Sequence, residues 1–522
     1  MSSRPVDARM VKGMSSPQQQ EQAHNGFRHD LLSSIVVFLV ALPLCLGIAV
    51  ACGVPPALGL ISGIIGGIVV GSLSGSPLQV SGPAAGLTVL VYEIVQRHGL
   101  GVLGAVVLLA GVIQLAAGAL KLGRWFRAIA PAVIHGMLAG IGVLLCVSQL
   151  HVMFDSKPQG SGLPNLLTIP REIWQAIGMT GGSGHLWAGA IGILTLITLL
   201  LWKRFRLDMY SRIPAALPGI AVATLVAQVF HLPIHTISLP TNLITAIQWP
   251  TLDSLGALIE APILLSALTL ALIASAETLL SATAVDQMHH GKRADYNKEL
   301  RSQGIGNILC GLVGALPMTG VIARSTVNVQ AGARTRRSTI LHGLWILLAV
   351  AAAPFVLELI PVASLAALLV YTGFKLIDLK VLRKLRAYGR TQVLIYGVTV
   401  AVIVAADLLT GVLVGFVLAL IKLVLTMSDL NAGLREDTTT KELVLELKGS
   451  ATFLSLPKLA EAIEAIPAGA TVRIEFEDLV YIDHACLEML ESWEKRHLKG
   501  GGTVKADRRA LIDHYSSPAD KP

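Results

Sequence analysis

Apolar runs of roughly 18–25 residues, the length that crosses a lipid bilayer as a helix, dominate the chain. Short polar or basic segments separate them, and we predict fourteen spanning segments in two sets of seven. The first set covers residues 31–53, 57–75, 79–96, 101–120, 129–152, 186–202 and 213–230. The second set covers residues 257–286, 300–315, 320–332, 338–358, 362–378, 391–407 and 410–427.

The pattern changes near residue 430, where the long apolar runs end. Alternating residues predict strands at 441–448, 471–476 and 503–505, and amphipathic patterns predict helices at 456–466 and 484–497. We therefore expect a small α/β domain after the membrane part. The predicted boundaries are a tail at 1–29, a transport domain at 30–428 with repeats at about 30–235 and 256–428, the α/β domain at 436–510, and a polar tail at 511–522.

Composition agrees with a membrane protein, because 53% of the residues are hydrophobic and only 14% are charged. Soluble globular chains carry about 25% charged residues. The first 29 residues are polar and the first apolar run is long enough to remain in the membrane, so no signal peptide is expected. The five cysteines form no CxxC pair, which argues against a zinc site or a disulfide framework.

The basic residues behind the net charge of +8 are distributed between the loops as the predicted topology requires. With a cytoplasmic N-terminus, the inner loops hold most basic residues, and residues 375–390 alone carry six. The outer loops carry only Arg97, Lys157 and Arg171. We therefore expect a multi-pass protein of a bacterial inner membrane with both termini and the α/β domain in the cytoplasm, and no nucleic-acid partner.

Two segments contain prolines and glycines that interrupt a helix, at residues 80–86 and 316–320. They open the third segment of each set of seven, and such paired breaks indicate a transporter's binding site. Because seven is odd, the two sets have opposite orientation and form an inverted repeat. The two half-helix N-termini would then present free N–H groups and positive dipole ends to an anion. Ordinary kinks with glycine packing are the alternative.

Two ionisable residues stand out among those within the predicted spans. Glu277 lies midway along the eighth, where a charged side chain is costly and needs a cavity or a partner. Ser281 lies one helical turn later, and a coupling role for this pair competes with a structural hydrogen bond. Arg324 lies four residues after Gly320, where a guanidinium could hold an oxyanion. Its alternatives are a structural pair with Glu277 or a position at the membrane surface.

Enzymatic motifs are not evident in the sequence. It contains no nucleophile elbow, P-loop or Rossmann fingerprint, so we expect neither an enzyme nor an ATP-driven pump. The scattered histidines His24, His289 and His290 have no metal-ligand spacing.

At these positions the chain resembles the SulP family of inorganic anion transporters over residues 27–505. The motifs that carry the resemblance are Ala41, Leu42 and Pro43 with Gly47; Ser81, Gly82 and Pro83; Gln303 to Asn307; Arg324 to Asn328; Ala331 to Thr335; and Tyr481 to His484. The resemblance implies an α-helical membrane fold with a seven-plus-seven inverted repeat of the uracil-permease type, in which a core domain moves against a gate domain. It also implies a homodimer and a C-terminal STAS domain.

The resemblance also implies the site residues. The anion would lie between the first segment and the two half-helices, lined by Leu44, Ile48, Ala84, Val321, Ala323 and Arg324. Because most of these side chains are apolar, backbone N–H groups must supply most of the binding. Bicarbonate transporters of the family also have a sodium site, whose matching positions here are Glu277, Ser281, Gly320 and Ile322.

The chain departs from the family pattern at two of these places. Ile322 stands where the sodium site has a hydroxyl, so coupling to Na⁺ and coupling to H⁺ both stay open, and no cofactor is implied beyond a bound Na⁺. His484 stands where related signalling domains carry a phosphorylated serine, so a packing or dimer-supporting role is expected for the STAS domain, with a regulatory partner site as the alternative.

We expect secondary active transport of a small inorganic anion by an elevator-like mechanism. Bicarbonate is the first candidate substrate, sulfate the second and a dicarboxylate the third. A nucleobase–proton symporter is an alternative that predicts more hydrogen-bonding side chains at the site. An anion channel or sensor is another, and it predicts conduction without ion coupling.

Overall fold

The computed structural model describes residues 17–123, 130–158, 162–177, 183–204, 214–239, 243–289, 291–437, 442–476 and 478–506. The predicted tail 511–522, residues 1–16 of the predicted N-terminal tail, and the basic loop residues Arg124, Arg127 and Arg206 lie outside these ranges. The chain divides into two compact units, Met1–Gly415 and Phe416–Pro522, which are described in turn.

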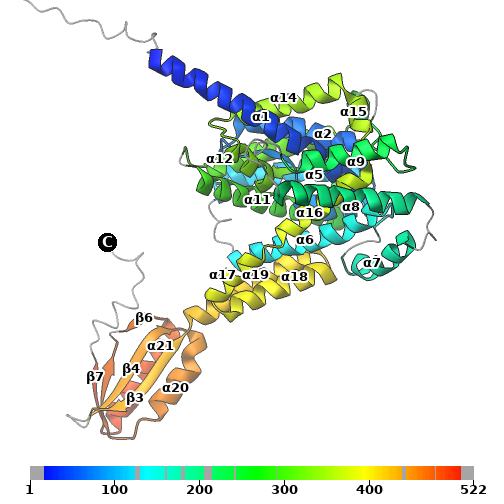
Figure 1. The fold of residues 1–522 in the computed structure, drawn as a ribbon. Helices are drawn as coiled ribbons and strands as arrows, with labels where there is room; N and C mark the ends of the chain where they lie inside the picture. The colour runs from blue at the N-terminus through cyan, green and yellow to red at the C-terminus, as the bar shows by residue number, and fades with distance from the viewer. Residues whose placement is uncertain are drawn as a thin grey trace, which may run out of the picture. The chain divides into compact units, whose positions relative to one another are not determined.

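Each of the fourteen predicted segments coincides with a helix or a half-helix, so the predicted membrane fold is confirmed (Figure 1). The first set is α1 (Pro17–Ala51), α2 (Pro56–Ile65), α4 (Thr88–His98), α5 (Leu100–Ala119), α6 (Pro131–Met153), α8 (Ser183–Arg204) and α9 (Ala216–Val229). The second set is α11 (Ala261–Met288), α12 (Tyr296–Leu312), α13 (Ile322–Gln330), α14 (Arg337–Ala352), α16 (Val362–Leu376), α18 (Arg390–Ala405) and α19 (Leu408–Met427). Among the described residues, eight helices are long and apolar enough to cross a membrane.

Several short elements complete the first unit. The second segment continues past α2 as a π-helical turn, η1 (Gly66–Val70), and a last turn, α3 (Gly71–Leu73). The sequence analysis did not predict the helices α7 (Gly162–Ile177) and α17 (Leu379–Ala387). Both are amphipathic, so they lack the continuous apolar run that identified the spans. The helices α10 (Leu252–Gly256) and α15 (Pro354–Glu358) are single turns beside spanning helices.

Helices α5 and α12 pack against each other through glycines. A Cβ atom on Gly111 would stand 2.5 Å from the backbone nitrogen of Ile308, and one on Gly304 would stand 2.5 Å from that of Leu115. Only glycine permits this backbone approach, which is the usual way in which membrane helices reach close contact. The packing fixes α12, which contacts the centre of the unit.

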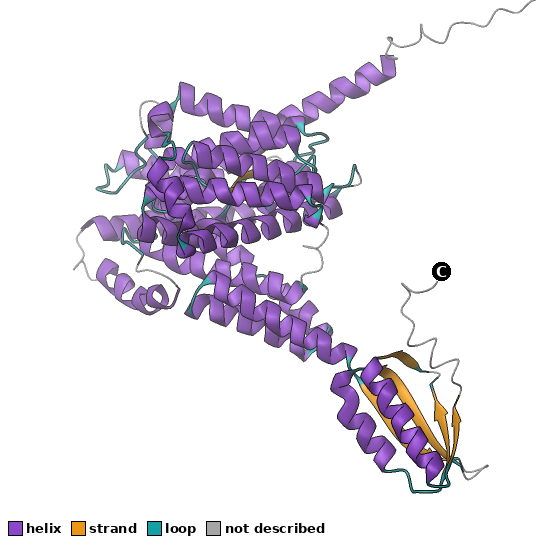
Figure 2. Cartoon of the chain, turned by 180° about the vertical axis from the view of Figure 1, so that it is seen from behind, coloured by secondary structure: helices purple, strands orange, loops and turns teal. Residues whose placement is uncertain are grey.

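The second unit contains a five-stranded sheet and two helices (Figure 2). The strands are β3 (Leu430–Glu436), β4 (Leu443–Ala451), β5 (Thr471–Glu475), β6 (Leu479–Ile482) and β7 (Thr503–Ala506), and the helices are α20 (Leu456–Glu464) and α21 (His484–Lys499). The sheet order is β3-β4-β5-β7, with β6 also paired to β4. Apolar side chains such as Leu445, Leu447, Ile463 and Trp493 form a core of its own.

Two strands of this sheet were missed. Strand β3 lies before residue 436, where the sequence analysis begins the domain, and pairs antiparallel with β4. Strand β6 contains Tyr481 and Ile482 of the motif that carries the STAS resemblance. Strand β6 has only four residues and is apolar at exposed and buried positions alike, and β3 has one buried residue, so neither shows a clear alternation in the sequence.

Candidate functional site

The two interrupted segments meet in the middle of the first unit as a pair of short strands. Strand β1 (Ser81–Pro83) pairs antiparallel with β2 (Met318–Gly320), with Ser81 opposite Gly320 and Pro83 opposite Met318. All residues of both strands are buried, and Figure 2 shows the pair in orange among the helices. Antiparallel pairing of equivalent segments is the arrangement that an inverted repeat requires.

A half-helix follows each strand. After β1 the chain turns through η2 (Ala85–Leu87) into α4, and after β2 it enters α13 at Ile322. The residues that precede these turns, Ala84 and Val321, have extended backbone and provide no side-chain cap. Because the first N–H groups of a helix have no partner within it, both half-helices present free donors and positive dipole ends next to the strand pair.

Helix α12 fixes the strand pair in place. The side chain of Asn307 accepts from Met318 N at 2.8 Å and donates to Met318 O at 3.0 Å. Its neighbour one turn earlier, Gln303, donates to Ser81 Oγ at 2.6 Å. The stretch Gln303 to Asn307, which contributed to the family resemblance, therefore satisfies the polar groups of both strands.

The peptide of Gly320 is held from both sides by α11. Its N–H donates to Thr278 Oγ1 at 3.1 Å, and its carbonyl accepts from Ser281 Oγ at 2.6 Å. A Cβ atom on Gly320 would overlap Nε2 of Gln79, which donates to the carbonyl of Thr278. Glycine is therefore required here, and the hydroxyl of Ser281 is already engaged.

The carboxylate of Glu277 lies against the first turn that follows β1. A Cβ atom on Gly86 would stand 2.8 Å from both carboxylate oxygens. Within the described part of the chain, Oε2 of Glu277 is buried and has no hydrogen-bond partner. A negative charge thus lies at the positive end of the third segment's half-helix, where the dipole favours it.

Arg324 is fully buried on α13 and is not a surface residue. Its Nη2 donates to the carbonyl of Pro83 at 3.2 Å, and a Cβ atom on Gly82 would overlap its Nη1. Its Nε and Nη1 have no hydrogen-bond partner among the described residues. No ion pair with Glu277 is present in the described structure. The guanidinium instead links α13, in the second repeat, to β1, in the first, and two of its nitrogens have no hydrogen-bond partner among the described residues.

The predicted lining residues differ in exposure. Leu44, Ile48 and Ala84 are buried in one apolar cluster, and Val321 packs against that cluster from its edge. Ala323 is exposed, and Ile322 is half-buried. The structure therefore brings α1, β1 and the start of α13 together, while Ala323 points to a more open surface.

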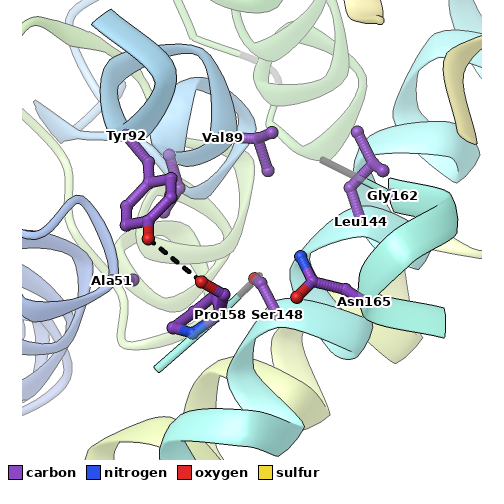
Figure 3. Close-up of a pocket in the computed structure, with 9 residues that line it drawn as sticks. Ala51, Val89, Tyr92, Leu144, Ser148, Pro158, Gly162 and Asn165 are labelled. Carbon is purple, nitrogen blue, oxygen red and sulfur yellow. Dashed lines mark hydrogen bonds between the residues drawn. The ribbon is translucent and has the colours of Figure 1, made fainter. Parts of the chain in front are cut away.

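A small cavity lies between helices α1 and α4 on one side and α6 and α7 on the other (Figure 3). Its volume is about 10 Å³, enough for about one water molecule. Thr88, on the first turn of α4, lines it together with Ser148 and Asn165. The hydroxyl of Tyr92 donates to the carbonyl of Pro158 at 3.3 Å across it.

Sequence reasoning gave no site role to several polar residues around the strand pair, namely Gln79, Thr88, Thr278, Gln303 and Asn307, although the last two belong to a motif that carries the family resemblance. Each lies in or next to an apolar segment, where a buried polar side chain needs a partner. That signal does not identify partners from other segments, such as Ser81 for Gln303.

Comparisons with known proteins agree with this architecture. Residues 27–399 match the model of the sulfate permease family. A putative sulfate transporter of Bacillus subtilis, YvdB, is 31% identical over 77% of this chain and 74% of its own length. The bicarbonate transporter BicA of a Picosynechococcus strain is 27% identical over 82% of this chain and 78% of its own length.

Two solved structures share the fold. The transmembrane domain of a cyanobacterial bicarbonate transporter, BicA, matches 76% of this chain and 97% of its own, with a TM-score of 0.58 at 23% identity. The structure of SLC26A9 matches 95% of this chain and 87% of its own, with a TM-score of 0.75 at 15% identity.

Proposed function

The chain belongs to the sulfate permease family of membrane anion transporters, and we propose that it is a secondary active transporter of a small inorganic oxyanion. Bicarbonate is the leading substrate. The compact apolar surroundings provided by Leu44, Ile48 and Ala84, together with the similarity to BicA, support this choice. Sulfate is the second candidate, supported by the 31% identity to YvdB, which is named as a putative sulfate transporter.

The observation that carries the proposal is the position of Glu277 beside Gly86. The anion binds the free N–H groups at the start of α4 and α13, and the Glu277 carboxylate lies at the same end of the α4 half-helix. Two negative charges at one helix terminus repel each other. Neutralising Glu277 with a cation removes this repulsion, so cation and anion bind together. Such linked binding is what symport requires.

We infer that this cation is a proton. A sodium ion at the family position would need oxygen ligands from Ser281 and Gly320, and these two oxygens are hydrogen-bonded to each other at 2.6 Å. Ile322 offers no side-chain oxygen as a further ligand. A carboxylate can take up a proton without any of these groups, whereas Na⁺ needs several oxygen ligands at once, and Ile322 removes one of those at the family position.

In an elevator mechanism, one group of helices carries the site past a second group, which gives alternating access. In the proposed elevator, α1 to α5 and α11 to α14 move as the core against a gate that includes α6, α8, α9, α16 and α18. The contact of Tyr92 with Pro158 links α4 to the segment after α6 and would close one side. We place the protein in a bacterial inner membrane as a homodimer, with both termini in the cytoplasm.

Uptake into proteoliposomes tests the proposal. Labelled bicarbonate and sulfate are offered to the full chain under an inward proton gradient, an inward sodium gradient, or neither. We expect the proton gradient to stimulate uptake and a protonophore to abolish that stimulation. In Glu277→Gln the stimulation disappears while anion exchange persists, and the control Glu93→Gln, on α4 away from the strand pair, behaves as the wild type. Uptake that responds to neither gradient refutes symport.

A further inference from the structure

A second, basic pocket lies at the opposite end of the α13 half-helix from the strand pair. Its volume is about 180 Å³, and the residues that line it are Pro77, Leu78, His289, Gly291, Lys292, Arg334, Thr335 and Arg336. They come from three segments, namely the loop before β1, the end of α11 and the loop after α13. Helix α13 has nine residues, so its length of about 14 Å separates this pocket from the N–H groups at its start.

The charge of the pocket favours an anion. Lys292, Arg334 and Arg336 contribute three cationic side chains, and none of the described lining residues carries a carboxylate. Arg336 is held in place because its Nη1 donates to the carbonyl of Ser72 at 2.6 Å. The described side chains of Lys292 and Arg334 form no ion pair within 4.0 Å, so their charges are available to a ligand.

A buried and unpartnered histidine nitrogen adds an independent sign of a ligand. The side chain of His289 is only 10% exposed. Its Nδ1 accepts from Gly291 N at 3.0 Å, which makes Nε2 the nitrogen that carries a proton in the neutral ring. That buried Nε2 has no hydrogen-bond partner among the described residues. An oxyanion in the pocket would supply the missing acceptor.

The acidic residues around the pocket are already engaged. Asp30 accepts from Arg334 N at 2.7 Å and from Thr335 N at 3.0 Å, so it orders the loop while the Arg334 side chain stays free. Asp286 accepts from Ala294 N at 3.0 Å, and its Oδ1 lies 4.0 Å from Nε2 of His289, too far for a hydrogen bond. Neither carboxylate lines the cavity.

Contacts among the described residues tie the walls of the pocket together. Leu78, Val285 and Ala333 form a small apolar cluster that joins its three segments. The side chain of Asn328 donates to the carbonyl of Leu78 at 2.9 Å, which ties α13 to the loop before β1. A preorganised cationic pocket binds an anion without first having to order its own loops.

We propose that this pocket binds a phosphate group, separately from the transported anion. Three cations and an N–H donor match the several acceptor oxygens and the charge of a phosphate. The volume is larger than a single small oxyanion needs, so the phosphate is either free inorganic phosphate or part of a larger molecule such as an anionic lipid headgroup.

Binding to the purified full chain tests the proposal and separates the two sources. Equilibrium dialysis with labelled phosphate measures binding of the free anion. Binding of a lipid is measured after reconstitution in nanodiscs of phosphatidylcholine with or without phosphatidylglycerol, as the amount of phosphatidylglycerol that stays with the protein when it is purified again. The variants are Lys292→Ala, Arg334→Ala and the control Arg337→Ala, which changes an exposed arginine at the start of α14 that does not line the cavity. All three positions are exposed, so the fold tolerates the changes.

We expect each pocket variant to weaken binding about tenfold, the effect of losing one charge-assisted hydrogen bond. Arg337→Ala retains wild-type binding. If the pocket variants lose phosphate binding, the ligand is free phosphate. If they lose only phosphatidylglycerol binding, the ligand is the lipid headgroup. The proposal is overturned if the wild type and all variants bind phosphate and phosphatidylglycerol equally. It is also overturned if Arg337→Ala loses as much binding as the pocket variants do. Anion uptake measured in parallel stays independent of the outcome, since these residues do not contact the strand pair.

Discussion

Gly86→Ala is the most direct probe of the arrangement at the strand pair. The new methyl group would stand 2.8 Å from both carboxylate oxygens of Glu277. Ordinary contact begins at 3.4 Å, so the carboxylate must move by about 0.6 Å. The end of a flexible side chain can make this shift while the backbone stays in place, so the fold survives and the charge is displaced from the half-helix.

The expected cost is about 1 kcal/mol or somewhat more, the lower range for overpacking. If that cost falls on the step in which Glu277 and the anion act together, gradient-driven uptake falls about tenfold. Thermal unfolding in detergent checks that the fold is retained. Gly101→Ala is the matched control, because a Cβ atom there has no heavy atom within 4 Å, and we expect its uptake to equal that of the wild type.

Glu277→Asp supplies the second arm of the test. Its carboxylate is one methylene shorter and leaves room for the methyl group, so Gly86→Ala costs less in the Asp background than in the wild type. Full uptake by Gly86→Ala, or equal losses in the two backgrounds, refutes the claim that this carboxylate works from its place beside the half-helix.

Three further outcomes follow from the contacts. Gly320→Ala overlaps Gln79, so we expect lost stability that Gln79→Ala partly restores in the double variant, measured by thermal unfolding. Ser281→Ala removes the shorter of two hydrogen bonds to the buried Gly320 carbonyl, which keeps only the 3.4 Å bond from Thr319 Oγ1, and lowers the free energy of unfolding by about 1 kcal/mol, while Ser281→Thr retains the bond. Burial raises the pKa of Cys486 to about 12, so its thiol stays protonated, and mass spectrometry should find no iodoacetamide labelling at pH 8 until the protein is denatured.

The sequence predicted the features that depend on local chemistry. The clusters of proline and glycine at residues 80–86 and 316–320 disfavour a continuous helix, so both breaks could be predicted from local composition, whereas the single Pro43 lies inside α1. The same local reasoning failed for α7, because this amphipathic helix has no continuous apolar run. It also failed for β3, a seven-residue strand with a weak alternation that pairs along its length with β4.

The contacts of the site residues could not be predicted from the sequence. Arg324 was predicted to hold the anion or to pair with Glu277, and its guanidinium lies against Gly82 and Pro83 from the other half of the repeat. Ser281 was predicted to bind the coupling ion, and it donates to Gly320 O. The contact of Arg324 depends on how the two repeats pack, and that of Ser281 depends on how α11 packs against β2 within the second repeat, so neither follows from local pattern.

The arrangement of Glu277 also determines how the two transported species must affect each other. A cation on Glu277 and an anion at the start of α4 stabilise one another, and thermodynamic linkage makes the effect equal in both directions. The affinity for the anion should therefore rise with the concentration of the coupling cation by the same factor by which the anion raises affinity for the cation. Because both effects act through one helix terminus, Glu277→Gln, which carries no charge, should bind the anion tightly at every cation concentration. A variant that still showed cation-dependent anion affinity would place the coupling charge elsewhere.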